Sequence, residues 1–260
     1  MKKITLLLAL SSVFVLGTGC SSINKIAWKA IGKDGDTIMK ELGEAQQEMS
    51  QAQDKALEAL GKKEEIADNE ETFEGTTKTF SQKNAANLKA RSVIIGDKNE
   101  RLNEALAENP KLDAEGKPLM GEANLMMASA TMKMVKNTTE TVAVCIGIKE
   151  LWGSGNKLQQ GVAVILVPPA VTMASFVVKD MKEASKTVKT LRKYGQENGV
   201  PNSEPNDELD IGLTSLDSTS TEGLPTDADA NKAAEEDKEE EEEEDSGKKK
   251  KGFLGGLLGK

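Results

Sequence analysis

Apolar residues recur along much of this chain at alternating intervals of four and three positions, which places them on one face of an α-helix. The clearest case is 36–60, where the spacing holds for three heptads. It predicts a helix with Asp36 as its N-cap, Leu60 as its last residue and Gly61 as its stop. The predicted buried seam consists of Ile38, Leu42, Ala45, Met49, Ala52, Ala56 and Ala59. An alanine-rich seam favours close packing within the chain, and a homo-oligomer through this face is the alternative.

Two more helices are predicted, at 78–108 and at 122–152, with turn-rich sequence between them. Gly96 is a candidate break in the first of these helices. The first is expected to bury Phe80, Leu88, Ile95, Leu102 and Leu106. The second is expected to bury Met127, Met134, Thr138, Thr141, Cys145, Ile148 and Trp152. Each helix would therefore turn one face toward a shared core.

Residues 161–178 carry no charge, and this stretch is borderline in length for a membrane span. Pro168 and Pro169 argue against an uninterrupted helix, because each ring removes a backbone donor and crowds the preceding turn. We predict a short apolar piece at 162–167, followed by a central buried helix that begins at the prolines and ends near Gly195. Its seam is Val177, Met181, Ala184, Val188 and Leu191. A membrane-inserting hairpin is the alternative.

These patterns predict an all-α fold, an antiparallel helical bundle of about four helices at 36–195. Aromatic residues make up only 3% of the chain, which favours helices over a sheet. Residues 196–247 are rich in Pro, Ser, Thr, Asp and Glu and are expected to be a disordered acidic linker, because they are too polar to form a core. Residues 248–260 form a separate basic and apolar tail.

The formal net charge of the chain is −9, and most of the excess acid lies between Glu197 and Asp245. The body that precedes this region is nearly neutral. Domains that bind nucleic acid carry a basic face, so we expect no nucleic-acid partner.

Carboxylates and lysines are plentiful, but none of them sits in a recognisable catalytic or metal-binding constellation. The chain has no histidine, the commonest general base and metal ligand near neutral pH. Cys145 lies in an apolar run, where burial raises the pKa of a thiol and makes it unreactive. We therefore expect no catalytic, cofactor-binding or metal-binding residues. If Cys20 is not modified, a disulfide between Cys20 and Cys145 is the alternative in an oxidising compartment.

The first nineteen residues have the layout of a secretory signal peptide. Lys2 and Lys3 precede an apolar run at 4–16, and small residues follow that run directly. The run is too short for a membrane-spanning helix of about 20 residues. We therefore predict a signal peptide at 1–19.

The sequence Leu16-Gly17-Thr18-Gly19-Cys20 resembles the lipobox of bacterial lipoproteins. The resemblance covers the signal region alone and implies cleavage between Gly19 and Cys20, with lipid attached to the new first residue, Cys20. Ser21, in place of the Asp that retains such proteins in the inner membrane, implies the outer membrane and a periplasm-facing body. Gly17 departs from the leucine that the family usually has at that position. Ordinary cleavage after Gly19, which would release a soluble protein, is the alternative.

Two segments have the composition of membrane-surface contacts. Residues 20–35 place lysines opposite an apolar helical face (Ile23, Ile26, Ala27, Ala30 and Ile31), and packing of this segment on the body is the alternative. Residues 248–260 join a lysine cluster to Phe and Leu. Attachment to peptidoglycan through Lys260 is a further alternative. The candidate membrane contacts are Ile23, Lys25, Ile26, Trp28, Lys29, Phe253, Leu254, Leu257 and Leu258.

Together these features predict a lipid-anchored, non-enzymatic envelope protein that acts as a helical scaffold, spacer or assembly factor. Its expected partners are the membrane and either another envelope protein or a second copy of the chain. One alternative is a carrier of apolar cargo in a cavity lined by Met126, Met127, Met132 and Met134. The other is an envelope enzyme that uses dispersed carboxylates.

Overall fold

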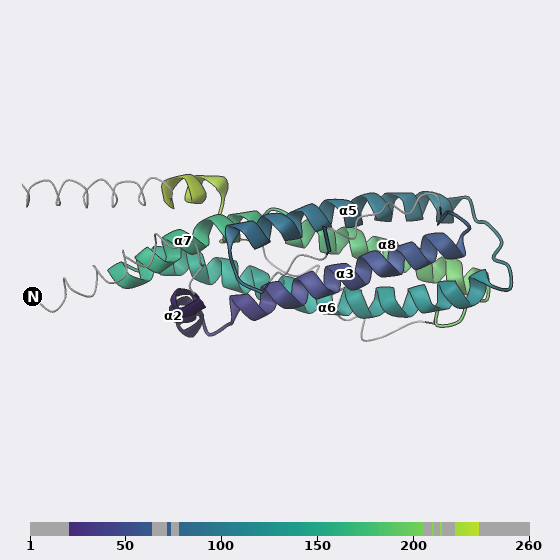
Figure 1. The fold of residues 1–260 in the computed structure, drawn as a ribbon, viewed down its shortest axis with the longest axis horizontal. Helices are drawn as coiled ribbons and strands as arrows, with labels where there is room; N and C mark the ends of the chain where they lie inside the picture. Colours follow the sequence, from purple (N-terminus) through teal and green to yellow (C-terminus); the bar gives the residue numbers. More distant parts are fainter. Residues whose placement is uncertain are drawn as a thin grey trace, which may run out of the picture.

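The computed structural model describes residues 21–63, 72–73, 78–204, 210, 214 and 222–233. This part of the chain is helical and contains no strand, which confirms the all-α prediction. Figure 1 shows an elongated bundle of long helices. Its elements are α2 (Ser21–Ile31), α3 (Gly35–Ala59), α5 (Gln82–Ala107), α6 (Gly116–Trp152), α7 (Lys157–Ala174) and α8 (Val177–Glu197).

The long helices do not alternate in direction as expected. Between α3 and α5, the side chain of Gln46 bonds Leu88 and that of Gln53 bonds Ile95, so both residue numbers rise together and the two helices are parallel. The pairs Gln82–Thr172 and Asn103–Thr187 show that α5 also runs parallel to α7 and α8. Only α6, about 55 Å long at 1.5 Å per residue, runs in the opposite direction. In the ion pairs between the two helices, the residue numbers rise along α3 while they fall along α6, as in Glu41–Lys136 and Lys55–Glu122.

The parallel arrangement follows from the path of the chain between α3 and α5. Both helices begin at the same end of the bundle, where the backbone N–H of Phe80 donates to the Asp36 carboxylate at 2.7 Å. The two ends of the connection, Leu60 and Ser81, therefore lie at opposite ends of α3, which is about 37 Å long at 1.5 Å per residue. A connection this long permits either direction, whereas the shorter connections on both sides of α6 join antiparallel neighbours.

The predicted seams of α3 and α8 form the core, which confirms those two patterns. Every seam residue of α3 is at most 9% exposed, and every seam residue of α8 is at most 2% exposed. Gly61 ends the α3 turn with φ +74, and the N–H groups of Gly61 and Lys62 bond back to Glu58 and Leu57. This is the glycine-terminated arrangement expected after Leu60.

Some helix boundaries differ from the predictions. Asp34, rather than Asp36, caps α3, since its side chain accepts from the N–H groups of Asp36 and Thr37. Gly96 does not break α5. The next helix, α6, starts at Gly116, six residues before its predicted start, so Pro118 lies in the first turn, where no backbone donor is needed.

The prolines lie inside α7, and the prediction that a helix begins at them is wrong. The helix ends instead at Ala174, and α8 starts at Val177 after a two-residue interruption that contains the buried Phe176. Taken as one stretch, Gln159–Glu197 is the only described helix that is long and apolar enough to cross a membrane by length and composition. However, 61% of its most apolar window is buried in the bundle, as in the core helix of a folded domain.

Two pieces of the region predicted as a disordered linker pack on the bundle. After α8, Val200 is 6% exposed and Ser203 is 2% exposed. Further along, residues 222–233 lie against α6 and end in a buried Ala233. The acidic run at 235–245 and the tail at 248–260 lie outside the described residues.

Candidate functional site

Helix α2 is the described element nearest to Cys20, and it is fixed to the body through Trp28. This indole is 7% exposed and packs edge-on against Phe80 with ring centroids 5.4 Å apart. It also covers Gly35, where an added Cβ would lie 2.5 Å from the Trp28 ring. Trp28 was a candidate membrane contact, but its burial in the bundle leaves little of it for lipid.

Two more residues complete the inner face of α2. The Asn24 amide donates to the Asp36 carboxylate at 3.0 Å and to the Phe80 carbonyl at 3.3 Å. Ile31 covers Gly147 of α6, whose added Cβ would lie 2.8 Å from the Ile31 side chain. The buried face is therefore rotated from the predicted one, because a satisfied amide and a large indole occupy the contact instead of Ile26 and Ala30.

The outer face of α2 carries the remaining candidate contacts of this helix. Lys25, Lys29 and Ala30 are exposed, and Ile26 is 39% exposed. Within the described chain, neither lysine has an ion-pair partner. The side chain of Ile23, and all of Phe253, Leu254, Leu257 and Leu258, fall outside what the structure describes. The result is a short basic surface with an exposed isoleucine, which is suited to a lipid headgroup layer.

Residues 222–233, here called the clasp, lie on α6 close to α2. The Lys149 ammonium bonds the Asp229 carboxylate at 3.1 Å and the Leu224 carbonyl at 3.4 Å. Asp229 also accepts from the N–H and hydroxyl of Thr226 at 2.7 and 2.9 Å, and these bonds hold the pKa of its carboxyl below the usual value although burial opposes this. Lys232 lies over the Trp152 ring, 5.2 Å from its centroid.

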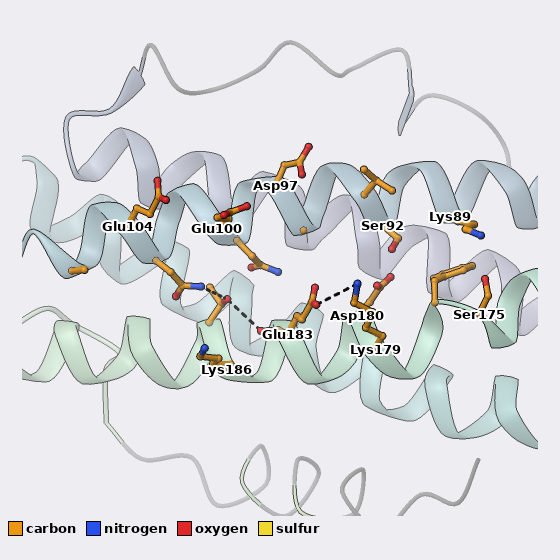
Figure 2. A pocket seen from close by; sticks show the side chains of 17 residues that line it. Lys89, Ser92, Asp97, Glu100, Glu104, Ser175, Lys179, Asp180, Glu183 and Lys186 are labelled. Atoms are coloured by element: carbon orange, nitrogen blue, oxygen red, sulfur yellow. Dashed lines mark hydrogen bonds and ion pairs between the residues drawn. The ribbon is translucent and has the colours of Figure 1, made fainter. Parts of the chain in front are cut away.

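The chain also forms an open groove of about 770 Å³ between α5 and α8 (Figure 2). Its lining includes five carboxylates and three lysines: Asp97, Glu100, Glu104, Asp180, Glu183, Lys89, Lys179 and Lys186. Figure 2 shows Asp97 and Glu104 directed away from α8, whereas Asp180 and Glu183 lie between the two helices. The carboxylates thus do not converge on one point, as a catalytic pair or a metal site requires.

Asp180 is the group in this groove with the largest change in acidity. Burial raises the pKa of its carboxyl from 3.8 to about 6, with a smaller opposing effect from the Ser92 hydroxyl. Glu183 adds repulsion and Lys179 a weaker attraction. In the described residues, no group of three or more Cys, Asp or Glu side chains is placed to hold a metal ion.

Between α3 and α5 lies a row of polar side chains that the seam analysis missed, four of them buried and one, Asp54, partly exposed. The Gln53 amide donates to the Ile95 carbonyl at 3.0 Å and to Asn99 at 2.8 Å. The Lys98 ammonium lies 2.8 Å from the Ser50 hydroxyl and 2.7 Å from the Asp54 carboxylate. We call these five residues the polar ladder. Two members belong to seven-residue repeats that were visible in the sequence, since Gln53 follows Gln46 by seven residues and Lys98 follows Arg91 by seven.

Arg91 fixes the returning segment to the side of α5. It is 2% exposed, and its guanidinium donates to the carbonyls of Thr72, Phe73 and Gly43 at 3.0, 3.1 and 3.4 Å. It also lies 5.3 Å from the centre of the Phe73 ring. Burial lowers the pKa of this guanidinium, but the group remains charged at any physiological pH.

Two expectations about individual side chains can be checked directly. Cys145 is 0% exposed, burial raises the pKa of its thiol to about 12, and its Sγ donates to the Ala170 carbonyl at 3.5 Å. The prediction that Cys145 lies in the core is confirmed, and its burial and raised pKa are the properties expected of an unreactive thiol. Met127 and Met134 are 0% and 2% exposed, and Met126 and Met132 pack partly buried on the same core. The four methionines therefore act as packing residues in this structure.

Comparison with known proteins returns no match: no family model, curated protein or solved structure shows significant similarity to this chain. The functional argument therefore depends on the residues and contacts described above.

Proposed function

We propose that this protein is a lipid-anchored, non-enzymatic lipoprotein of the bacterial envelope that acts as a rigid helical scaffold or spacer. The observation that carries the proposal is the junction between Cys20 and α2. The lipobox-like sequence ends at Cys20, and the helix begins at the next residue, Ser21. A lipid on Cys20 would then hold the body at the membrane with no flexible spacer between them.

The two faces of α2 support this arrangement. Asn24, Trp28 and Ile31 attach the helix to the bundle, while Lys25, Ile26 and Lys29 face outward. Acyl chains contribute about 0.8 kcal/mol per buried methylene, and two chains give stable anchoring. Lys25 and Lys29, which have no ion-pair partner among the described residues, add attraction to anionic lipid. With Ser21 after the cysteine, the proposed location is the periplasmic face of the outer membrane.

The rest of the bundle supports a scaffold better than an enzyme or a carrier. The α6 helix makes the bundle about 55 Å long, which suits a spacer. The four methionines that would line a cargo cavity are packed into the core, and the groove carboxylates point in different directions. The seam of α3 is already buried within the chain, so a second copy would have to use another surface.

Metabolic labelling with palmitate tests the anchor. Wild-type protein should incorporate label and partition into the detergent phase, and Cys20→Ser should do neither. Cys145→Ser is the matched control, since it removes the other cysteine and should keep the label. Unlabelled wild-type protein that is recovered without detergent would overturn the proposal.

A further inference from the structure

Helix α8 carries a row of exposed lysines along one side. They recur at alternating intervals of three and four residues over about 21 Å. The members of this lysine row are Lys179, Lys182, Lys186, Lys189 and Lys193. The two end members pair within the helix, Lys179 with Glu183 and Lys193 with Glu197. The three middle lysines have no ion-pair partner among the described residues.

The neighbouring helix α5 carries the opposite charge at the same spacing. Asp97, Glu100 and Glu104 are exposed, share one side of α5 and have no ion-pair partner in the described part of the chain. We call these three residues the acid row. The same spacing continues toward the start of α5 with the exposed apolar residues Ala90 and Val93, and Val93 is 59% exposed.

The two rows stand at the same height in the bundle but do not meet within one chain. Asn103 of α5 donates to Thr187 of the parallel helix α8 at 3.1 Å, which sets the acid row level with the middle of the lysine row. Figure 2 shows Glu100 level with Lys186, whereas the other two acids are directed away from α8. The rows are therefore opposite in charge and lie on the two sides of the groove of about 770 Å³. We call this outer surface of α5 and α8 the charged face.

The charged face is complementary to itself under one kind of two-fold symmetry. In a dimer of identical chains, a two-fold axis makes every contact occur twice. If the axis runs along the bundle, α5 of one copy faces α8 of the other at the same height, so each acid row meets a lysine row. If the axis crosses the bundle, α5 faces α5 and like charges meet. Electrostatic complementarity thus favours two parallel copies.

A parallel pair also agrees with a lipid on Cys20. Helix α2 lies at the end of the bundle where α3 and α5 begin, because Asn24 bonds both Asp36 and the Phe80 carbonyl. In a parallel pair both α2 helices lie at the same end, so that the lipids of both copies can enter one bilayer. In an antiparallel pair they would lie at opposite ends.

The size of the charged face suits a modest interface. Residues 86–107 of α5 extend over about 32 Å, and two helices with axes 8–10 Å apart present a width of about 20 Å. This gives about 600 Å² per copy and about 1,200 Å² in total, at the lower end for specific complexes. Attachment of both copies to one membrane raises their effective concentration to the order of 1 mM, so a weak interface is sufficient.

We propose that a second copy of this chain packs in parallel on the charged face, so that the acid row of each copy pairs with the lysine row of the other. The groove between α5 and α8 is then covered by the partner. This inference deepens the proposed function by naming a partner for the scaffold. Only the shared bilayer depends on the anchor.

Sedimentation velocity of the lipid-free Cys20→Ser protein tests whether the pair forms. About 0.1 M salt screens charges beyond about 10 Å and so limits repulsion between the acidic regions of the two copies. We expect a concentration-dependent dimer that weakens as more salt is added. A protein that stays monomeric up to about 1 mM would overturn the proposal, because confinement to a membrane would not populate such a dimer either.

Two charge-reversed chains test the surface. One carries Asp97→Lys, Glu100→Lys and Glu104→Lys, and the other carries Lys182→Glu, Lys186→Glu and Lys189→Glu. Each chain alone brings like charges together in both contacts, so its own dimer should weaken at least about a hundredfold. In a mixture of the two chains both contacts again join opposite charges, and the mixed dimer should recover to within about threefold of the parent affinity.

The outcomes separate a second copy from other partners. Dimers that persist in each reversed chain would show that the copies use another surface. Weakened dimers without recovery in the mixture would show that the two rows do not meet each other, as when the lysines pair with the acidic run at 235–245. Either result contradicts the proposal.

A control variant changes the net charge equally on another side of the bundle. Lys55→Glu, Lys133→Glu and Lys136→Glu replace lysines that lie where α3 meets α6, and the dimer should keep its parent affinity. A loss as large as in the lysine-reversed chain would assign the effect to net charge and refute the pairing.

Circular dichroism should show parent helix content in every variant, since the reversed side chains of the two rows are exposed. If a reversal lowers helix content, Lys182→Gln, Lys186→Gln and Lys189→Gln replace it and should weaken the dimer about tenfold. These proteins carry no lipid, so the dimer and the palmitate labelling of Cys20 can fail independently.

Discussion

The buried pair Lys98–Asp54 provides the sharpest test of how the parallel helices α3 and α5 are held together. Lys98 projects from α5 into the core with its side chain 5% exposed, and its ammonium lies 2.7 Å from the Asp54 carboxylate of α3. The change is Lys98→Met, which keeps most of the aliphatic stem and removes the charge. Asp54 then keeps its charge but loses its only ion-pair partner within the described chain.

The magnitude follows from how much solvent each partner retains. Breaking a fully buried pair by removing one charge costs about 3–5 kcal/mol. The Asp54 side chain is 29% exposed, so water compensates part of its loss and we expect Lys98→Met to cost about 2–3 kcal/mol. Asp54→Asn leaves the ammonium of Lys98, the more deeply buried of the two charges, without its counterion, and should lower the free energy of unfolding by about 3 kcal/mol. The double variant should cost little more than either single one, which gives a coupling of about 2 kcal/mol.

Urea unfolding of the Cys20→Ser protein, followed by far-UV circular dichroism, measures all four free energies of unfolding. The matched control is the same cycle at Lys40 and Glu44, an ion pair at 3.5 Å whose side chains are 52% and 61% exposed. Its coupling should be about 0.3–0.5 kcal/mol. If the buried pair shows no more coupling than the exposed one, the reasoning is refuted.

Three other predictions concern single side chains, each measured by urea unfolding. Gly195→Ala should lower the free energy of unfolding by about 2–3 kcal/mol, because the new Cβ would lie 2.1 Å from the Ser203 hydroxyl oxygen. Gly96→Ala should raise it by about 0.5–1 kcal/mol, because the new Cβ would meet no atom closer than 4.0 Å. Asp180 holds its proton up to about pH 6 in the fold and to about 3.8 when unfolded, so the unfolding free energy should fall between pH 4 and 7 by about 2 kcal/mol. Asp180→Asn should remove this fall and be the more stable protein at pH 8; a wild-type-like pH profile in this variant would contradict the assignment. Arg91→Lys should lower the free energy of unfolding by about 2 kcal/mol and speed protease cleavage within 62–77, because one ammonium cannot reach all three carbonyls that the guanidinium bonds. Unchanged cleavage would contradict the role of Arg91 in holding Thr72 and Phe73 against α5.

The periodic pattern of apolar residues was sufficient to place α3, α5 and α6 approximately and to identify the buried seams of α3 and α8. The seams of α3 and α8 could be read from the sequence because each depends on which residues share a helical face, which is a local property. The unreactive Cys145 could be inferred for the same reason, since its neighbours in sequence are apolar. The break at the prolines was misplaced, because α7 continues through Pro168 and Pro169, which lie between the core residues Val167 and Ala170, and ends only at Ala174.

Helix direction and the choice of face were decided only by the tertiary structure. The parallel pairing of α3 with α5 depends on residues 60–81 returning along the bundle, and a connection of that length does not specify a direction in the sequence. The face that α2 buries depends on the hydrogen bond from Asn24 to Asp36 and on the packing of Trp28 over Gly35. Only the fold brings these residues into contact.

The sequence by itself thus determined an all-α chain, its helical seams and a lipobox-like start. The groove between α5 and α8, the polar ladder and the clasp were decided by the fold. Each of these features brings together side chains from segments that are far apart in the sequence. Their ion pairs and hydrogen bonds can form only after those segments have packed against one another.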